Sequence, residues 1–337
     1  MLKRLSLFVI TILLIGLIVG CGEKTTSSDD DDGKITIALL PKKKGMPYFT
    51  SCAEGAQAAA DELGDVVLIY DGPTDGSPEK AAAMIELWIL KGVDVIAVSP
   101  NDPAVVGPAM ERARAKGIKV VTWDADADAD AREFFINQAT AQDIGFALVD
   151  VMVQDLGGSG VTGDVAIITA ALTAANQTEW IKHMRVRLKD YPGLKLVATK
   201  PAGENQALAL SIAKDLMKAY PDLKGIFAIS SAAFPGAAEA VKQAGRVGEV
   251  MVTGLSPPNS MRACVKDGTV KSVILWNTKD LGYLTVYAAR ALVKGDLKPG
   301  DTTFIAGRLG ERKIEGDNIM LGDMLIFTIE NIDDFDF

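Results

Sequence analysis

Residues 117–126 are Gly117-Ile118-Lys119-Val120-Val121-Thr122-Trp123-Asp124-Ala125-Asp126. A helical segment with basic residues ends at this glycine, and a run of strand-forming residues follows until a tryptophan and two carboxylates stop it. In an open parallel sheet, side chains at the carboxyl end of a strand face the ligand crevice. An aspartate beside a tryptophan suits a small polyhydroxylated ligand, because the carboxylate accepts hydrogen bonds from hydroxyls and the ring covers C–H faces. A solvated acidic turn is the alternative.

The segments around this stretch alternate between strand and helix patterns. Helices are predicted to open at proline-containing starts, where the missing N–H is harmless. The expected strands here are Ile35–Leu40, Val66–Tyr70, Val93–Ser99 and Ile118–Trp123, and the helices begin at Pro47, Pro78 and Pro103. Strands separated by helices of this length form a parallel, doubly wound sheet.

The same alternation restarts near Ala141. The expected strands are Val165–Thr169, Leu194–Thr199, Leu223–Ile229, Val250–Leu255 and Val270–Trp276, with helices over 141–156, 176–188, 206–220, 235–243 and 258–266. We therefore predict an α/β protein with two doubly wound parallel-sheet lobes joined by a hinge. Small ligands usually bind in the cleft between such lobes.

Composition excludes several classes of function. The net charge of −9 argues against a nucleic-acid partner, since phosphate binding needs a basic face. The one histidine, His183, lies in a mixed helical stretch, so we expect no metal site and no histidine-based acid–base chemistry. The three cysteines are widely spaced without a CxxC pair, so no disulfide framework is expected. We expect no cofactor.

The first residues have the pattern of an export signal. Lys3 and Arg4 precede an apolar run, and the sequence Ile18-Val19-Gly20-Cys21 resembles the end of a bacterial lipoprotein signal, in which the cysteine receives a lipid. We expect a signal peptide over 1–20, lipidation of Cys21 and a flexible acidic linker over 21–33. A plain membrane anchor is the alternative, but the apolar run is short for a span. The protein is expected in the periplasm or at the cell surface, as a membrane-anchored lipoprotein.

Two motifs mimic other functions. Gly158–Gly163 matches GxGxxG, but it follows a helix and precedes a strand, the reverse of a dinucleotide site. Four aspartates between 124 and 130 mimic a calcium loop, but Ala129 and Phe135 replace the required glycine and glutamate. We find no motif of a hydrolase, kinase or metalloprotease, and we expect no enzymatic activity.

Four stretches together resemble the periplasmic sugar-binding proteins of ABC importers, in the ribose-binding-protein class, and within it the rhamnose-binding and autoinducer-2-binding members. They are Leu40-Pro41-Lys42 with Pro47-Tyr48-Phe49, Val121-Thr122-Trp123-Asp124, Ala174-Ala175-Asn176-Gln177-Thr178-Glu179-Trp180 and Ile274-Leu275-Trp276-Asn277. Segments 71–74, 136–138 and 280–283 extend the likeness, which covers the chain after about Lys34.

The resemblance implies roles for particular residues. Lys42 and Asp124 match the pair that holds ligand hydroxyls, and Tyr48 and Phe49 match aromatic residues that sandwich the sugar ring. Further candidate ligand contacts are Asp126, Asn176, Gln177, Trp180, Ser231, Trp276 and Asn277. Without the resemblance, Tyr48 and Phe49 could start a core helix, Lys42 could be a solvated loop charge, Trp180 could pack the lobe and Trp276 could seal the hinge.

The resemblance also implies the biological role. It predicts three crossovers, near Asn137, Asn277 and Phe304, with one lobe made of 34–136 plus 278–304 and the other of 137–277 plus 305–337. The expected ligand is a rhamnose-like deoxysugar or a related monosaccharide, or autoinducer-2, and the expected partner is an ABC permease. Ile229 and Ser231 stand where autoinducer-2 receptors carry proline and alanine, which argues against that ligand.

We expect a monomer. A sensory receptor without transport is the main alternative function. A LacI-type repressor core is disfavoured, because a signal and linker occupy the place of its DNA-binding helices.

Overall fold

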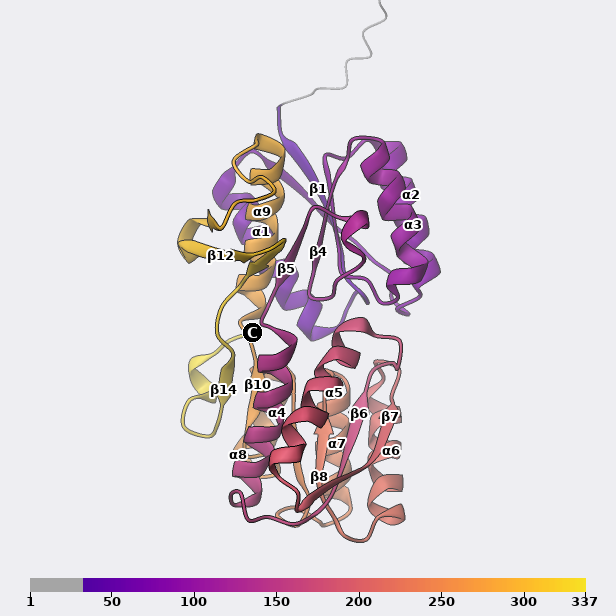
Figure 1. Ribbon diagram of the computed structural model, residues 1–337, viewed down its shortest axis with the longest axis vertical. Helices are drawn as coiled ribbons and strands as arrows, with labels where there is room; N and C mark the ends of the chain where they lie inside the picture. Colours follow the sequence, from indigo (N-terminus) through magenta and orange to yellow (C-terminus); the bar gives the residue numbers. More distant parts are fainter. Residues whose placement is uncertain (1–32) are drawn as a thin grey trace, which may run out of the picture. The chain divides into compact units, whose positions relative to one another are not determined.

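The computed structural model describes residues 33–337, of which 34–337 form one compact unit. The predicted signal peptide, the predicted lipidation site Cys21 and all of the predicted linker but Gly33 lie outside the described residues. Two separate parallel sheets organise the compact unit, as the sequence pattern predicted (Figure 1). We call the parts built on them the first and the second lobe.

The first lobe is built on an eight-stranded sheet with the order β11-β12-β13-β5-β4-β3-β1-β2. Its parallel part contains β1 (Ile35–Leu40), β2 (Val66–Tyr70), β3 (Val95–Val98), β4 (Lys119–Trp123), β5 (Phe134–Asn137) and β13 (Asn318–Met320). Strands β12 (Glu311–Glu315) and β11 (Thr303–Ile305) extend its edge in antiparallel pairing.

Helices cover both faces of this sheet because its strands are apolar on both sides. Along β1, Ala38 and Leu40 pack with α2 (Pro78–Lys91) and α3 (Pro103–Ala115). Ile37 and Leu39 belong to the core on the opposite face, with α1 (Pro47–Leu63) and α9 (Thr278–Lys294). Figure 1 shows these two helix pairs on either side of the strands. A sheet buried on both faces is typical of parallel α/β architecture.

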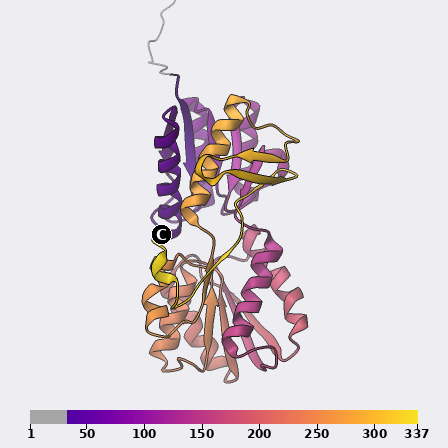
Figure 2. The same cartoon turned by 90° about the vertical axis from the view of Figure 1, so that its left-hand side faces the viewer.

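The second lobe is built on a four-stranded parallel sheet with the order β7-β6-β8-β9. Its strands are β6 (Gly163–Thr169), β7 (Leu194–Pro201), β8 (Leu223–Ala228) and β9 (Met251–Gly254), and β10 (Val273–Leu275) pairs with β14 (Leu325–Phe327) beside it. Its helices are α4 (Ala141–Leu156), α5 (Ala175–Arg187), α6 (Gln206–Ala219), α7 (Ala233–Gln243) and α8 (Pro258–Lys266). Figure 2 shows α4 and α5 on one side of the sheet and the orange helices α7 and α8 on the other.

The chain crosses between the lobes three times. It crosses after β5 and again between β10 and α9, at the two places expected near Asn137 and Asn277. The third crossover was expected near Phe304 but lies at 321–324, between β13 and β14. The reason is that β13 pairs in parallel with β5, with Ile319 beside Ile136, so residues 305–320 remain with the first lobe.

Two further observations concern the described residues as a whole. Within residues 33–337, no helix combines the length and the apolar character needed to span a bilayer. Cys52 and Cys264 are both free thiols.

Candidate ligand-binding site

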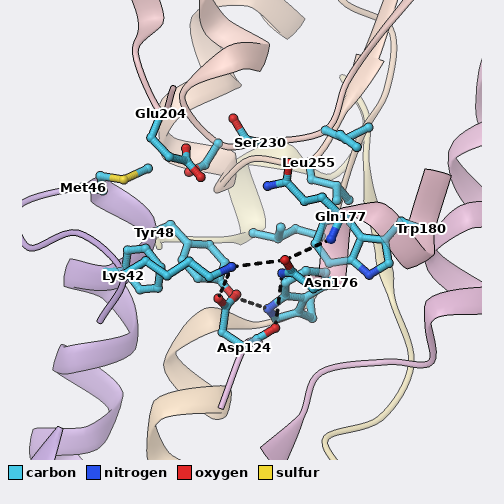
Figure 3. A pocket seen from close by; sticks show the side chains of 15 residues that line it. Lys42, Met46, Tyr48, Asp124, Asn176, Gln177, Trp180, Glu204, Ser230 and Leu255 are labelled. Carbon is cyan, nitrogen blue, oxygen red and sulfur yellow. Dashed lines mark hydrogen bonds and ion pairs between the residues drawn. The ribbon is translucent and has the colours of Figure 1, made fainter. Parts of the chain in front are cut away.

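A pocket lies between the two lobes at the carboxyl ends of their strands (Figure 3). It encloses about 380 Å³ that no protein atom occupies, counting the part open to solvent. The first lobe lines it with Lys42, Met46, Tyr48, Phe49 and Asp124. The second lobe lines it with Asn176, Gln177, Trp180, Glu204, Ile229, Ser230, Ser231, Leu255, Leu275 and Trp276. A pocket between two lobes, lined by aromatic and polar side chains, is a usual place for a small ligand to bind.

Asp124 is the centre of the polar network on the first lobe. It directly follows β4 and is buried, with a left-handed φ of 63°, which is uncommon for a residue other than glycine. Its Oδ1 accepts a hydrogen bond from the Tyr48 hydroxyl at 2.8 Å, and its Oδ2 accepts one from the Ser99 hydroxyl at 2.8 Å. Strained backbone of this kind persists where surrounding contacts hold it, often at functional sites.

Lys42 connects Asp124 to the second lobe. Its ammonium lies 3.2 Å from Asp124 Oδ2 and donates to Asn176 Oδ1, also at 3.2 Å. Only 5% of the Lys42 side chain is exposed, so this charge is held by the pocket and not by solvent. Asn176 Nδ2 in turn donates to the Asp124 carbonyl oxygen at 3.4 Å. Three predicted site residues from distant parts of the chain therefore form one network across the lobes.

Gln177 presents only one side of its amide to the pocket. Its Oε1 accepts hydrogen bonds from the Thr169 hydroxyl and, at 2.8 Å, from the Ala170 backbone N–H. These bonds settle the orientation of the amide, since the oxygen must face the two donors. The Nε2 group is therefore the part of Gln177 that remains to donate to a ligand.

Aromatic rings form the apolar wall of the pocket. Tyr48 packs edge-to-face against both Phe49 and Trp276, with ring centroids 5.0 and 6.0 Å apart, and Trp180 packs edge-to-face on Trp276. The Trp276 indole N–H donates to the Tyr48 hydroxyl at 3.0 Å. Burial, followed by the negative charge of Asp124, holds the pKa of Tyr48 well above its usual value, so this hydroxyl stays protonated and acts as a donor to Asp124.

Glu204 lines the pocket although no sequence argument selected it. It follows β7 and comes two residues before α6, with a left-handed φ of 49°. Burial raises the pKa of its carboxyl, an effect that Lys42 opposes and Asp124 reinforces. The rule that singled out Asp124, a carboxylate at the carboxyl end of a parallel strand, applies equally to Glu204 and could have found it.

Two expected contacts lie elsewhere. Asp126 does not line the pocket, because its carboxylate accepts hydrogen bonds from the Arg132 guanidinium at 2.6 and 2.7 Å and one from Thr122. Asn277 also lies outside the pocket, because its side chain caps α9 by accepting from the Asp280 N–H at 3.1 Å. Both residues have structural roles next to the site. The other predicted site residues all line the pocket.

The donor set of the pocket is that of a hydrogen-bonding site and not of a metal centre. Within residues 33–337, no group of three or more histidine, cysteine, aspartate or glutamate side chains is arranged to hold a metal ion. The pocket instead offers one ammonium, two carboxylates, side-chain amides, serine hydroxyls and aromatic rings. Such a set can hold a small ligand that carries several hydroxyl groups.

Comparison with known proteins agrees with this geometry. The model of the periplasmic binding protein domain matches residues 37–297, and the chain belongs to this family. Its two-lobed α/β architecture is the type I fold of the family. The chain is similar to the ribose import binding protein RbsB of Haemophilus influenzae, with 27% identity over 85% of this chain and 94% of that protein.

Two solved structures are similar over nearly their whole length. LsrB from Clostridium saccharobutylicum, in complex with AI-2, has 25% identity and a TM-score of 0.85, and the match covers 90% of this chain and all of LsrB. An ABC transporter solute-binding protein from Clostridium phytofermentas with bound L-rhamnose has 29% identity and a TM-score of 0.84, and the match covers 89% of this chain and 98% of the other. These relatives are binding components of transporters and not enzymes.

Proposed function

We propose that the protein binds a neutral monosaccharide of the L-rhamnose type between its lobes and delivers it to an ABC permease. The observation that carries this proposal is the network of Lys42, Asp124 and Asn176, which joins the lobes inside a pocket with aromatic walls. Sugars bind well in such a setting, because hydroxyls pair with the polar groups while C–H faces pack on the rings.

The proposed mechanism is closure of the lobes on the ligand. Ligand would enter between the lobes when they are apart and be enclosed by hinge motion at the three crossover segments. The ligand shifts the protein toward the closed form only because it binds that form with higher affinity than the open form. Because Lys42 already contacts Asn176 across the lobes, a ligand hydroxyl that inserts between their polar atoms can replace that direct contact. The closed surface would then dock on the permease.

L-rhamnose is favoured over AI-2 by residues on the second-lobe side of the pocket. Ser231 adds a hydroxyl, and Ile229 adds a branched side chain, at the two positions where resemblance to the autoinducer-2 receptors predicts alanine and proline. The TM-scores to the AI-2-bound and the L-rhamnose-bound structure are 0.85 and 0.84, so similarity in fold does not decide between the two ligands.

A thermal-shift screen of the full-length chain in detergent tests the proposal. The panel contains L-rhamnose, D-ribose, D-allose and AI-2. A ligand that binds only the folded state stabilises it by about 2.7 kcal/mol at a hundred times its dissociation constant, which raises Tm. We expect L-rhamnose to give the largest rise. A larger rise with AI-2 would replace the proposed ligand, and no rise with any member would reject sugar binding.

We also propose that Cys21 carries a lipid anchor and that the protein works outside the cytoplasm. The apolar run before Ile18-Val19-Gly20-Cys21 supports this proposal. Membrane fractionation after incorporation of a labelled fatty acid tests it. Wild type should carry the label and sediment with membranes, whereas Cys21→Ala should lose the label. An unlabelled wild-type protein would reject the anchor.

A further inference from the structure

Glu204 holds a carboxylate oxygen to which no described residue donates a hydrogen bond. Its Oε2 is shielded from solvent and has no hydrogen-bond partner among the described residues, although the residue as a whole is partly exposed. Leaving such an atom unpaired disfavours the folded protein, and more so for a charged group. This position of the pocket therefore carries an unfavourable feature.

The loop around Glu204 is built to hold this side chain in place. Gly203 and Glu204 both adopt left-handed φ values, of 63° and 49°. The Gly203 N–H donates to the Ala170 carbonyl at 2.8 Å, and Asn205 caps α6 by accepting from the Leu208 N–H. Lys43 of the first lobe donates to the Glu204 carbonyl oxygen at 3.2 Å. These backbone contacts fix the loop that carries the carboxylate on the second-lobe side of the pocket. There the charge of Lys42 and a hydrogen bond from Ser230 oppose the burial that raises the pKa of the carboxyl, while Oε2 has no hydrogen-bond partner among the described residues.

The charges on the two sides of the pocket differ. On the first lobe, the Lys42 ammonium and the Asp124 carboxylate neutralise each other at 3.2 Å. On the second lobe, Glu204 adds a carboxylate whose Oε2 has no donor among residues 33–337. Carboxylates accept strong hydrogen bonds from hydroxyl groups, and enclosed polar atoms in a binding site are commonly completed by the ligand.

We infer that Glu204 is a specificity-determining ligand contact, whose Oε2 accepts a hydrogen bond from a hydroxyl on the side of the ligand that faces the second lobe. The ligand class is a neutral polyhydroxylated molecule with donors on two sides, one for the Lys42–Asp124 pair and one for Glu204. This inference rests on the proposed function, and it adds a residue that sets which sugars are accepted.

The test compares Glu204→Ala and Glu204→Gln with the matched control Glu179→Gln, in the full-length chain in detergent. Glu179 is an exposed carboxylate of the same lobe and pairs with Lys182 on the surface. Two quantities are measured for each variant: Tm without ligand, and the dissociation constant by titration calorimetry for the sugar that gives the largest rise in Tm with wild type.

We expect Glu204→Ala to weaken binding by on the order of 10- to 100-fold, which is the usual effect of losing a hydrogen bond to a charged group. Glu204→Gln keeps a neutral acceptor and should weaken binding less. Both variants should keep or raise Tm without ligand, because an unsatisfied carboxylate is removed. A residue with a merely structural role would lower Tm instead. The Glu179→Gln control should change neither quantity.

The outcomes separate this inference from the proposed function. If the sugar binds wild type and Glu204→Ala within twofold of each other, the contact is rejected while sugar binding stands. If no sugar raises Tm of wild type, the proposed function is rejected. The Glu204 assignment is then decided by Tm without ligand. A higher Tm of Glu204→Gln than of wild type supports an unsatisfied acceptor at this position, and a lower Tm overturns the assignment.

Discussion

Breaking the ion pair between Asp124 and Lys42 is the most informative single perturbation of this protein. Both side chains are about 5% exposed, so either charge left alone would remain buried. Removing one partner of a buried pair usually destabilises a protein by about 3–5 kcal/mol, because the other charge stays unpaired. Lys42 keeps its contact to Asn176 Oδ1 at 3.2 Å, which favours the lower end of that range.

The two substitutions at Asp124 should differ in a defined order. Asp124→Asn keeps the side-chain shape, and asparagine tolerates the left-handed backbone, so we expect a loss of about 3 kcal/mol in the free energy of unfolding. Asp124→Ala also removes the acceptor of the Tyr48 and Ser99 hydroxyls and places alanine at a φ of 63°. The lost acceptor and the strained alanine each add about 1–2 kcal/mol, so we expect about 5–7 kcal/mol in total.

Urea unfolding of the full-length chain, followed by circular dichroism, measures these losses. Asp71→Asn is the matched control, because the Lys44–Asp71 pair has similar chemistry at 2.9 Å but is about half exposed. An exposed pair contributes at most about 1 kcal/mol. The double variant Lys42→Met/Asp124→Asn should lose less than the sum of its single variants, since no unpaired charge remains. Losses that add, or an Asp124→Asn loss no larger than the control, would refute the reasoning.

Three further predictions concern packing, the reassigned aspartate and acid stability. Gly282→Ala should lower Tm by several degrees, because a Cβ at this position of α9 would come within 1.8 Å of the Cys52 carbonyl oxygen of α1. The control Gly107→Ala has open space around it and should keep or raise Tm. Equal effects of the two substitutions in a thermal melt would contradict this close approach. Asp126→Asn should lower Tm, because it removes one of the two carboxylates that pair with the buried Arg132, the other being Asp317. The ligand dissociation constant should stay within twofold of wild type, and a tenfold weaker affinity in calorimetry would return Asp126 to the site. The pKa of Asp65 is lowered to about 2, chiefly by the hydrogen bond from Arg290. Asp65 should therefore stabilise the folded protein at pH values above the usual pKa of an aspartate, and that stabilisation should disappear as the pH falls toward 2. The difference in Tm between wild type and Asp65→Asn should therefore shrink from pH 6 to pH 2, and a constant difference would exclude the linkage.

The alternation of strands and helices could be predicted from local patterns. The bounds predicted for β1 and β2 agree with the structure, because each is a continuous apolar run between turn residues. The predicted starts of α1, α2 and α3 agree as well, since each opens at a proline, and in α2 the Ser77 side chain caps the helix by accepting from the Lys80 N–H. Such signals lie within a few residues of each other and need no tertiary contact.

Elements that depend on distant partners were missed. Strand β5 has only four residues, Phe134–Asn137, and is stabilised between β4 and β13. The strands from β11 to β13 are short and half exposed, and their pairing with the first sheet moved the third crossover from near Phe304 to 321–324. A strand pairing such as Ile319 with Ile136, which lie 319 − 136 = 183 positions apart, leaves no local pattern.

The sequence by itself determined the fold class, the family resemblance and the residue types of the site, since strand and helix periods and strand-end polar residues are local features. Only the tertiary structure decided which polar groups are satisfied. It paired Asp126 with Arg132 and committed Asn277 to capping α9, although both stand beside residues that line the pocket. Within the part of the chain that the structure describes, it also left Glu204 Oε2 without a donor. The physical reason is that hydrogen bonding is settled by which groups meet across the fold, and one-dimensional spacing does not carry that information.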